Sequence, residues 1–329
     1  MRKSNKKGAG MLGKLLRKNE IVATTLCIVI VAVLTLRGQV FWTAANFDSL
    51  QAATAPIAIV AFGMMILLIC GYFDLSIGSI MLLAGILSGR LALLGAPIPV
   101  IVILVLLAGF LVGCVNGFLV ATLKINALIA TIGTQYICYG VAMTMWDGIW
   151  ALGKFSEGFV EIGGGQFLGL YYMTWIMLIL LAGFTYFLKY MSSGRLLFFV
   201  GGNREAARLM GFNDKRIIFS CYAATGFLAA LAGLLQVARI QTPTQYQGEN
   251  VHMACIIACV VGGGSFAGGK GSAIGAALGV AFMSLLTNMF NLLQMNPQLQ
   301  NVVVGITLVV VIVIDGYLNL KKMRAMGNI

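Results

Sequence analysis

Charged side chains are scarce in this chain, and their scarcity already defines its class. Only 10% of the 329 residues are Asp, Glu, Lys or Arg, whereas 60% are hydrophobic, and the mean hydropathy is +0.96. An ordinary soluble domain carries about 25% charged residues. The composition therefore excludes a soluble globular protein and predicts an integral membrane protein.

The residue patterns that carry catalysis or bind metals are also missing. The one histidine, His252, is expected at the start of a span, and no pair of carboxylates falls inside an apolar run, so a proton relay lacks its usual parts. The seven cysteines show no CxxC spacing, which argues against a disulfide framework or a zinc site. We find no GxSxG or HExxH motif either, and we expect neither an enzyme nor a metal site.

Most of the basic residues behind the formal net charge of +12 lie in three clusters. Seven basic residues lie in the first eighteen positions, six between Lys189 and Arg216, and three in the carboxy-terminal tail. Such clusters mark cytoplasmic segments by the positive-inside rule, and the first could also contact anionic lipid headgroups. We therefore expect membrane lipid rather than nucleic acid as a partner, with cytoplasmic tails at 1–19 and 321–329.

The apolar segments predict an all-α polytopic membrane bundle of about ten transmembrane helices between residues 20 and 320. A span needs about 20 mostly apolar residues. An even number puts both termini in the cytoplasm with a loop at 190–215, and it puts the segment 147–170 outside as a polar, flexible loop. The predicted spans are 20–37, 50–71, 77–95, 98–123, 127–147, 170–189, 216–238, 251–265, 272–294 and 299–318.

The cytoplasmic loop contains a short helix signal at GGNREAARLMG. Asn203 is a suitable N-cap, Glu205 complements the helix dipole, Ala206 and Ala207 continue the first turn, and Gly211 is a suitable stop. A transport pore without its own energy source needs a cytoplasmic surface on which a motor can dock. The helix is either such a docking surface or a solvated connection.

Glycine spacing predicts two different structures. Glycines four residues apart allow helices to approach closely, and this spacing occurs at 85 and 89, at 109, 113 and 117, and at 275 and 279. A denser group is expected to break the helix or form a re-entrant turn. It comprises Gly262, Gly263, Gly264, Gly268, Gly269 and Gly271.

The same region contains GSFAGGKG, which nearly matches a phosphate-binding loop. Gly271 stands where that motif needs Ser or Thr to bind magnesium, and no buried strand precedes it. We therefore expect no ATP binding, and no other cofactor, in this chain.

Polar residues inside the spans are candidates for a transport path. Asp74 in GYFDLSIGS either lies near a gate or forms a structural turn, in which it or Ser76 caps the third span; the structural role is favoured. Neutral amides and hydroxyls suit a neutral, polyhydroxylated solute, although they also join helices to one another. The path candidates are Asn116, Gln135, Tyr136 and Asn288.

Four motifs in fixed order resemble the permease subunit of bacterial ribose- and xylose-type ABC importers. The resemblance extends from about Asn46 to Asp315, and the motifs read GYFDLSIGS, GRLLFFVGGNREAARLMGFNDKRI, GFLAALAGLLQVARI and VVGGGSFAGGKGSAIGAALG. Many relatives have an acidic segment before the glycine break, whereas this chain has HMACIIACVVGG, so the resemblance does not identify the sugar.

The resemblance implies a pore subunit in the bacterial plasma (inner) membrane. It implies a homodimeric or heterodimeric pore, two cytoplasmic ATP-binding subunits that use the ATP, and a periplasmic or lipid-anchored solute-binding protein. It also implies a coupling helix at Glu205, Ala206, Ala207 and Gly211. The residues alone leave open a stand-alone secondary transporter of neutral polar solutes or a passive channel.

Overall fold

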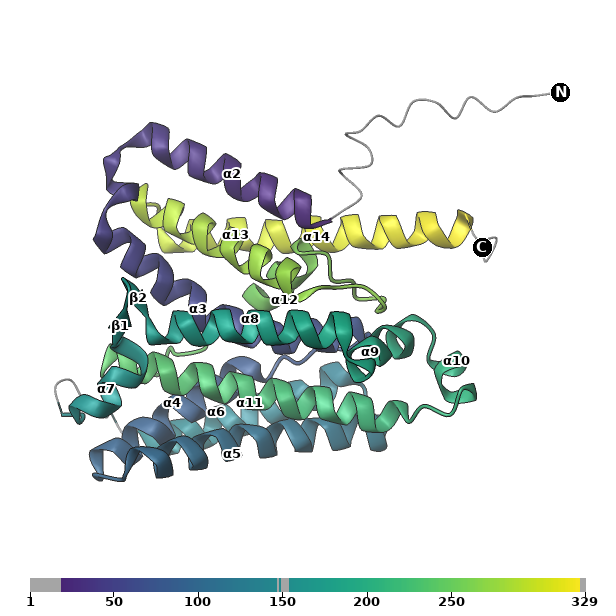
Figure 1. Cartoon of the computed structure of the whole chain (residues 1–329), viewed down its shortest axis with the longest axis horizontal. Helices are drawn as coiled ribbons and strands as arrows, with labels where there is room; N and C mark the ends of the chain where they lie inside the picture. Colours follow the sequence, from purple (N-terminus) through teal and green to yellow (C-terminus); the bar gives the residue numbers. More distant parts are fainter. Residues whose placement is uncertain (1–18, 147, 149–153, 326–329) are drawn as a thin grey trace.

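The computed structural model describes residues 19–146, 148 and 154–325 as a bundle of helices whose axes run mostly along the longest dimension (Figure 1). Long apolar runs form helices in a membrane because a helix satisfies its own backbone hydrogen bonds. The helices are α2 (Asn19–Arg37), α3 (Ala44–Ile69), α4 (Ile77–Leu93), α5 (Ile98–Gly117), α6 (Ala127–Trp146), α7 (Glu157–Gly164), α8 (Tyr172–Tyr190), α9 (Ser192–Gly202), α10 (Arg204–Leu209), α11 (Asp214–Ile240), α12 (Val251–Val261), α13 (Ala273–Leu292) and α14 (Pro297–Ala325).

The predicted all-α fold is confirmed, and a helix covers most of each of the ten predicted spans. Six described helices are long and apolar enough to cross a membrane, namely α3, α5 with its π-helical extension Phe118–Thr122, α6, α8, α11 and α13. By contrast, α12 has 11 residues, or about 17 Å at 1.5 Å per residue. It covers roughly half of a ~30 Å hydrocarbon core and cannot span it alone.

Helices α3 and α11 form the centre of the bundle. The part of α3 from Ala55 to Ile69 is buried except for Ile57, as expected for a helix surrounded by other helices. Helix α11 packs against α3, α4 and α5, and its fully buried Tyr222 donates a hydrogen bond of 2.8 Å to the carbonyl oxygen of Phe73. This core fixes the positions of the chain segments on either side of it.

The glycine spacings have two kinds of packing partner. A Cβ at Gly113 would lie 2.9 Å from the Ala223 Cα of α11, and a Cβ at Gly279 would lie 3.0 Å from the Ala258 Cα of α12, so close helix packing is confirmed there. Gly85 and Gly89 of α4 are also in close contact, but with Gln247 and Pro243 of a connecting segment. The spacing of glycines alone therefore indicates a close packing contact, but it does not identify the packing partner.

The two ends of the bundle differ in character. Figure 1 shows α9, α10 and the end of α14 at the right, and α7 with a short hairpin at the left. The hairpin pairs β1 (Gln166–Phe167) with β2 (Leu170–Tyr171), and a 3-10 helix, Gln39–Trp42, lies between α2 and α3. Helix α14 continues to Ala325, beyond the predicted end of the last span, so part of the predicted tail is helical.

The predicted flexible loop at 147–170 is largely folded where it is described, while positions 147 and 149–153 lie outside the described residues. Phe159 of α7 is fully buried, and Gly163 lies directly against the backbone of α11. The hairpin is attached to α3 because the Gln51 amide donates to the Gly169 carbonyl at 3.2 Å and accepts from the Tyr171 N–H at 3.0 Å. The loop is therefore ordered by packing that its polar composition did not reveal.

Candidate functional site

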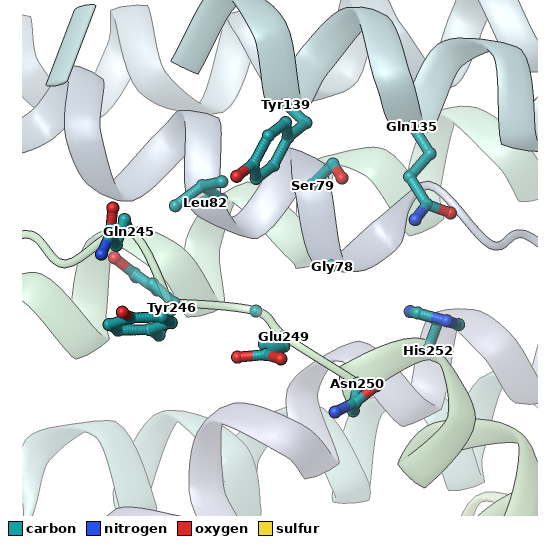
Figure 2. A pocket seen from close by; sticks show the side chains of 12 residues that line it. Gly78, Ser79, Leu82, Gln135, Tyr139, Gln245, Tyr246, Glu249, Asn250 and His252 are labelled. Carbon is teal, nitrogen blue, oxygen red and sulfur yellow. The ribbon is translucent and has the colours of Figure 1, made fainter. Parts of the chain in front are cut away.

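A polar cavity of about 390 Å³ lies where α4, α6 and α12 meet the connection from α11 to α12 (Figure 2). Its size falls within the range of small-molecule sites. The lining comprises Gly78, Ser79 and Leu82 of α4, Gln135 and Tyr139 of α6, residues 245–250 of the connection, and His252 of α12.

Two interruptions of the helical chain create this cavity. The chain leaves α3 after Ile69, runs without a helix, and starts α4 at Ile77. It also leaves α11 after Ile240 and starts α12 at Val251. The two short helices therefore begin beside the cavity, an arrangement found at the binding sites of many transporters.

The connection 241–250 follows α4 in the opposite direction. Pro243 contacts Gly89, Gln247 contacts Gly85, and the backbone of Gly248 contacts that of Gly78. Gly248 has φ +79°, and its Cβ would overlap the Gly78 carbonyl oxygen, so both conformation and space require glycine there. The Gln247 amide donates to the Gly233 carbonyl at 2.8 Å and thereby attaches the connection to α11.

The lining groups suit a neutral, hydroxyl-rich solute. Gln135, Gln245 and Asn250 offer amides that can both donate to and accept from hydroxyl groups, and Glu249 adds a carboxylate acceptor. Figure 2 shows the Tyr139 ring from α6 and the Tyr246 ring from the connection on the borders of the cavity. Their exposed fractions of 48% and 68% leave ring surface available for contact with a solute.

Only one of the four path candidates lines this cavity, namely Gln135. Tyr136 is its sequence neighbour, is 71% exposed and is not part of the lining. Asn288 of α13 is buried and donates to the Asn46 side chain of α3 at 2.6 Å, so its amide joins two helices. Asn116 does not line the cavity either, because its amide donates to Asp74 and Ser76.

Asp74 and Ser76 form a fully buried turn together with Asn116. The Asp74 carboxylate accepts from the Ser76 N–H at 2.8 Å, from the Ser76 hydroxyl at 2.6 Å and from the Asn116 amide at 3.1 Å. The Asn116 amide also donates to the Ser76 hydroxyl at 2.8 Å. The carboxylate therefore holds the start of α4 against α5, which is the structural turn favoured from the sequence.

Most of the lining was not identified from the sequence. Gln245, Tyr246, Glu249 and Asn250 were missed because the run QTPTQYQGEN has the composition of an exposed loop, and Tyr139 of α6 was missed as well. A usable signal was present: the run is rich in amides, and Gly78, Gly85 and Gly89 on α4 had no assigned partner. His252 was expected at the start of a span, and it lies in the first turn of α12, where it lines the cavity.

The predicted helix in the cytoplasmic loop is present as α10. Asn203 caps it by accepting from the Ala206 N–H at 2.9 Å. Gly211 has φ +83° and follows the last turn, while the Phe212 N–H donates to the Ala207 carbonyl at 3.1 Å. Glu205 is exposed, and Ala207 is buried.

Helix α10 also presents apolar surface and is fixed to the bundle by charge. Leu209 is 89% exposed and was not identified from the sequence. The Arg208 guanidinium donates to the Asp214 carboxylate at the start of α11 with distances of 3.0 and 2.6 Å. This hydrogen-bonded pair raises the pKa of Arg208 above its usual value. Arg204 lies over the Tyr72 ring, 4.8 Å from its centroid.

The glycine-dense segment forms the predicted helix break between α12 and α13. Gly263, Gly268 and Gly269 have positive φ, a conformation that side chains rarely adopt. The Gly269 N–H donates to the Ile69 carbonyl at the end of α3 with a distance of 2.8 Å. Gly264 packs against the Met65 sulfur of α3, while Gly262 lies directly against α13. The break is therefore packed against both helices.

A helical membrane bundle with a polar cavity between interrupted helices is typical of solute-transport permeases. A family model described as "Branched-chain amino acid transport system / permease component" matches residues 46–312. The chain belongs to this family of permease components, and it is a multi-pass membrane protein of a transport system rather than a catalytic enzyme.

Individual relatives agree with the resemblance seen in the motifs. The ribose import permease protein RbsC of Haemophilus influenzae is 33% identical over 90% of this chain and 93% of that protein. RbsC of Escherichia coli K12 is 31% identical over 88% and 91%. The autoinducer 2 import system permease protein LsrC of E. coli K12 / DH10B is 30% identical over 93% and 89%. No solved structure matches the chain.

Proposed function

We propose that this chain is the pore subunit of an ATP-driven importer for a sugar or sugar-like neutral solute. The observation that carries the proposal is the polar cavity between α4, α6 and α12. Its amides, phenols and single carboxylate can exchange hydrogen bonds with hydroxyl groups as the solute leaves water. The printed names of the ribose and autoinducer 2 import permeases support the same substrate class.

The end that carries α10 faces the cytoplasm in this proposal. The basic residues of the Lys189–Arg216 segment favour that side. Separate ATP-binding subunits dock on α10 at exposed Glu205 and Leu209, and a periplasmic or lipid-anchored binding protein delivers the solute to the opposite end. A second permease subunit, identical or different, completes the pore.

Coupling in this proposal uses the contacts of α9 with the interruption between α3 and α4 and with the glycine-dense break between α12 and α13. Gly201 near the end of α9 touches the Ile69 carbonyl, where α3 stops, and Gly268, where the chain passes between α12 and α13. The first leads through residues 70–76 to Gly78 of α4, and the second leads back along α12 to His252, and both of these residues line the cavity. A displacement of α10 would therefore move both cavity walls, as alternating access requires.

The test is uptake into proteoliposomes that contain this chain with its ATP-binding subunits and binding protein. Uptake of radiolabelled ribose is measured first, followed by other neutral sugars. We expect ATP-dependent uptake of at least one such solute and no ATP hydrolysis by the purified chain alone. Uptake by the chain alone, driven by an ion gradient, would instead establish the secondary transporter.

A further inference from the structure

A second cavity lies on the flank of the bundle and shares no residue with the polar cavity. It has a volume of about 630 Å³ and is bordered by α8 on one side and α11 on the other. Ile66 of α3 contributes to its floor, and Ser193 and Leu197 of α9 close one end. Figure 1 shows α8 and α11 running along the bundle, with α9 at their right-hand ends.

The walls of this groove are apolar. They include Ile179, Leu180, Phe184 and Phe187 of α8, together with Ile217 and Ala224 of α11. Ile179 is 68% exposed, so the groove is open to the outside of the bundle. Since α8 and α11 are membrane helices, hydrocarbon rather than water surrounds this opening.

A cationic side chain stands at the α9 end of the groove. Arg216, in the first turn of α11, lines the groove there together with Ser193. Within the described part of the chain, no hydrogen bond or ion pair joins the Arg216 guanidinium to another side chain. Its neighbour Asp214 is already bound to Arg208. The guanidinium is therefore available to an anion at the mouth of an apolar groove.

We propose that this groove binds an anionic phospholipid of the leaflet at the α10 end. One acyl chain occupies the space between α8 and α11, and the phosphate accepts hydrogen bonds from Arg216 and the Ser193 hydroxyl. An anionic phospholipid matches this groove because it is long and apolar with a negative charge at one end, whereas the groove is apolar with the cationic Arg216 at one end. Basic pockets between helices on the cytoplasmic side are suited to such headgroups, and guanidinium pairs well with phosphate.

Two variants separate the acyl site from the headgroup site. A Cβ at Gly183, which lines the groove, meets no atom within 4 Å. The Gly183→Leu side chain therefore enters the open groove and occupies part of the space for the acyl chain. Gly140→Leu on α6 is the matched control, because Gly140 also has no atom within 4 Å and lies away from the groove. Arg216→Gln removes the charge and leaves the groove open.

The experiment is native mass spectrometry of the detergent-purified full chain with added phosphatidylglycerol or phosphatidylcholine of identical acyl chains. We expect the wild type and Gly140→Leu to retain one phosphatidylglycerol at least several-fold more than phosphatidylcholine. Arg216→Gln should abolish that preference, and Gly183→Leu should reduce retention of both lipids. Thermal melts of the wild type and the variants with each lipid should rank the stabilisation by lipid in the same order as the lipid retention.

Three results would overturn the proposal. The first is equal retention of the two lipids by the wild type, and the second is undiminished lipid retention in Gly183→Leu. The third is a dimer that Gly183→Leu dissociates while Gly140→Leu does not, which would show that a second copy of the chain covers the groove.

Discussion

The Cα of Gly201 faces the carbonyl oxygen of Ile69 so closely that no side chain fits between α9 and the end of α3. On the next residue, Gly202, an added Cβ would meet nothing within 4 Å. Two neighbouring glycines therefore differ in the room that they leave for a side chain, although the backbones of both lie against the glycine-dense segment. Gly201 joins the segment leading to α10 with the end of α3 and with the break between α12 and α13, whereas the side-chain position of Gly202 is open.

This difference predicts that Gly201→Ala impairs coupling and Gly202→Ala does not. A methyl group at position 201 would force α9 away from Ile69 and Gly269, and overpacking of this kind costs about 1–3 kcal/mol. We expect Gly201→Ala to assemble with the ATP-binding subunits but to transport less solute per ATP hydrolysed. The measurement is uptake and ATPase rate on the same proteoliposomes, with pull-down of the subunits as the assembly control. An unchanged ratio in Gly201→Ala would contradict this coupling route.

A second prediction concerns the cavity wall. Tyr139 lines the cavity, whereas Tyr136 on the same helix does not. An aromatic contact is worth about 0.5–1.5 kcal/mol, so Tyr139→Ala should raise the KM for uptake by up to about tenfold. Tyr136→Ala should leave the KM unchanged. Equal effects of the two substitutions on the KM would show that the cavity is not part of the transport path.

The sequence predicted the helices well because a membrane requires long apolar runs, and such runs are visible in composition. It also predicted the cap at Asn203 and the break at the glycine-dense segment, since both depend on residues close together in the chain. The cavity was different. Its main wall is the polar connection that contains Tyr246 and Glu249, and its position depends on contacts with α4 that no local pattern reports.

The roles of individual polar side chains were equally hard to assign. Asn116 and Gln135 are both amides within apolar helices, and nothing nearby in the sequence distinguishes them. In the structure Asn116 is paired with the Asp74 turn, while Gln135 borders open space. Partners across the bundle decide which amide joins helices and which can meet a solute.

A third prediction tests the attachment of α10 to α11. Arg208 and Asp214 form a two-pronged hydrogen-bonded ion pair. Removing either partner, with Arg208→Gln or Asp214→Asn, should lower ATP-driven uptake because α10 then moves without pulling on α11. The double variant should take up solute no more slowly than the more impaired single variant. This double-mutant cycle is read from initial uptake rates, and strictly additive losses would show that the two residues act separately.

A fourth prediction addresses the buried turn at the start of α4. Asp74→Ala would leave the Ser76 N–H and the Ser76 hydroxyl without their acceptor inside the bundle, and the Asn116 amide would keep only the Ser76 hydroxyl as its acceptor. An unsatisfied buried polar group costs about 1–3 kcal/mol, so the loss of these contacts should lower the Tm of the detergent-purified chain by several degrees. Asn116→Leu removes one donor together with its need for a partner and should cost less. Ser49→Ala is the control, since Ser49 is exposed and its hydroxyl bonds only to the Ala45 carbonyl of its own helix. If Asp74→Ala melts like Ser49→Ala while uptake is lost, Asp74 acts in gating and not in holding the turn.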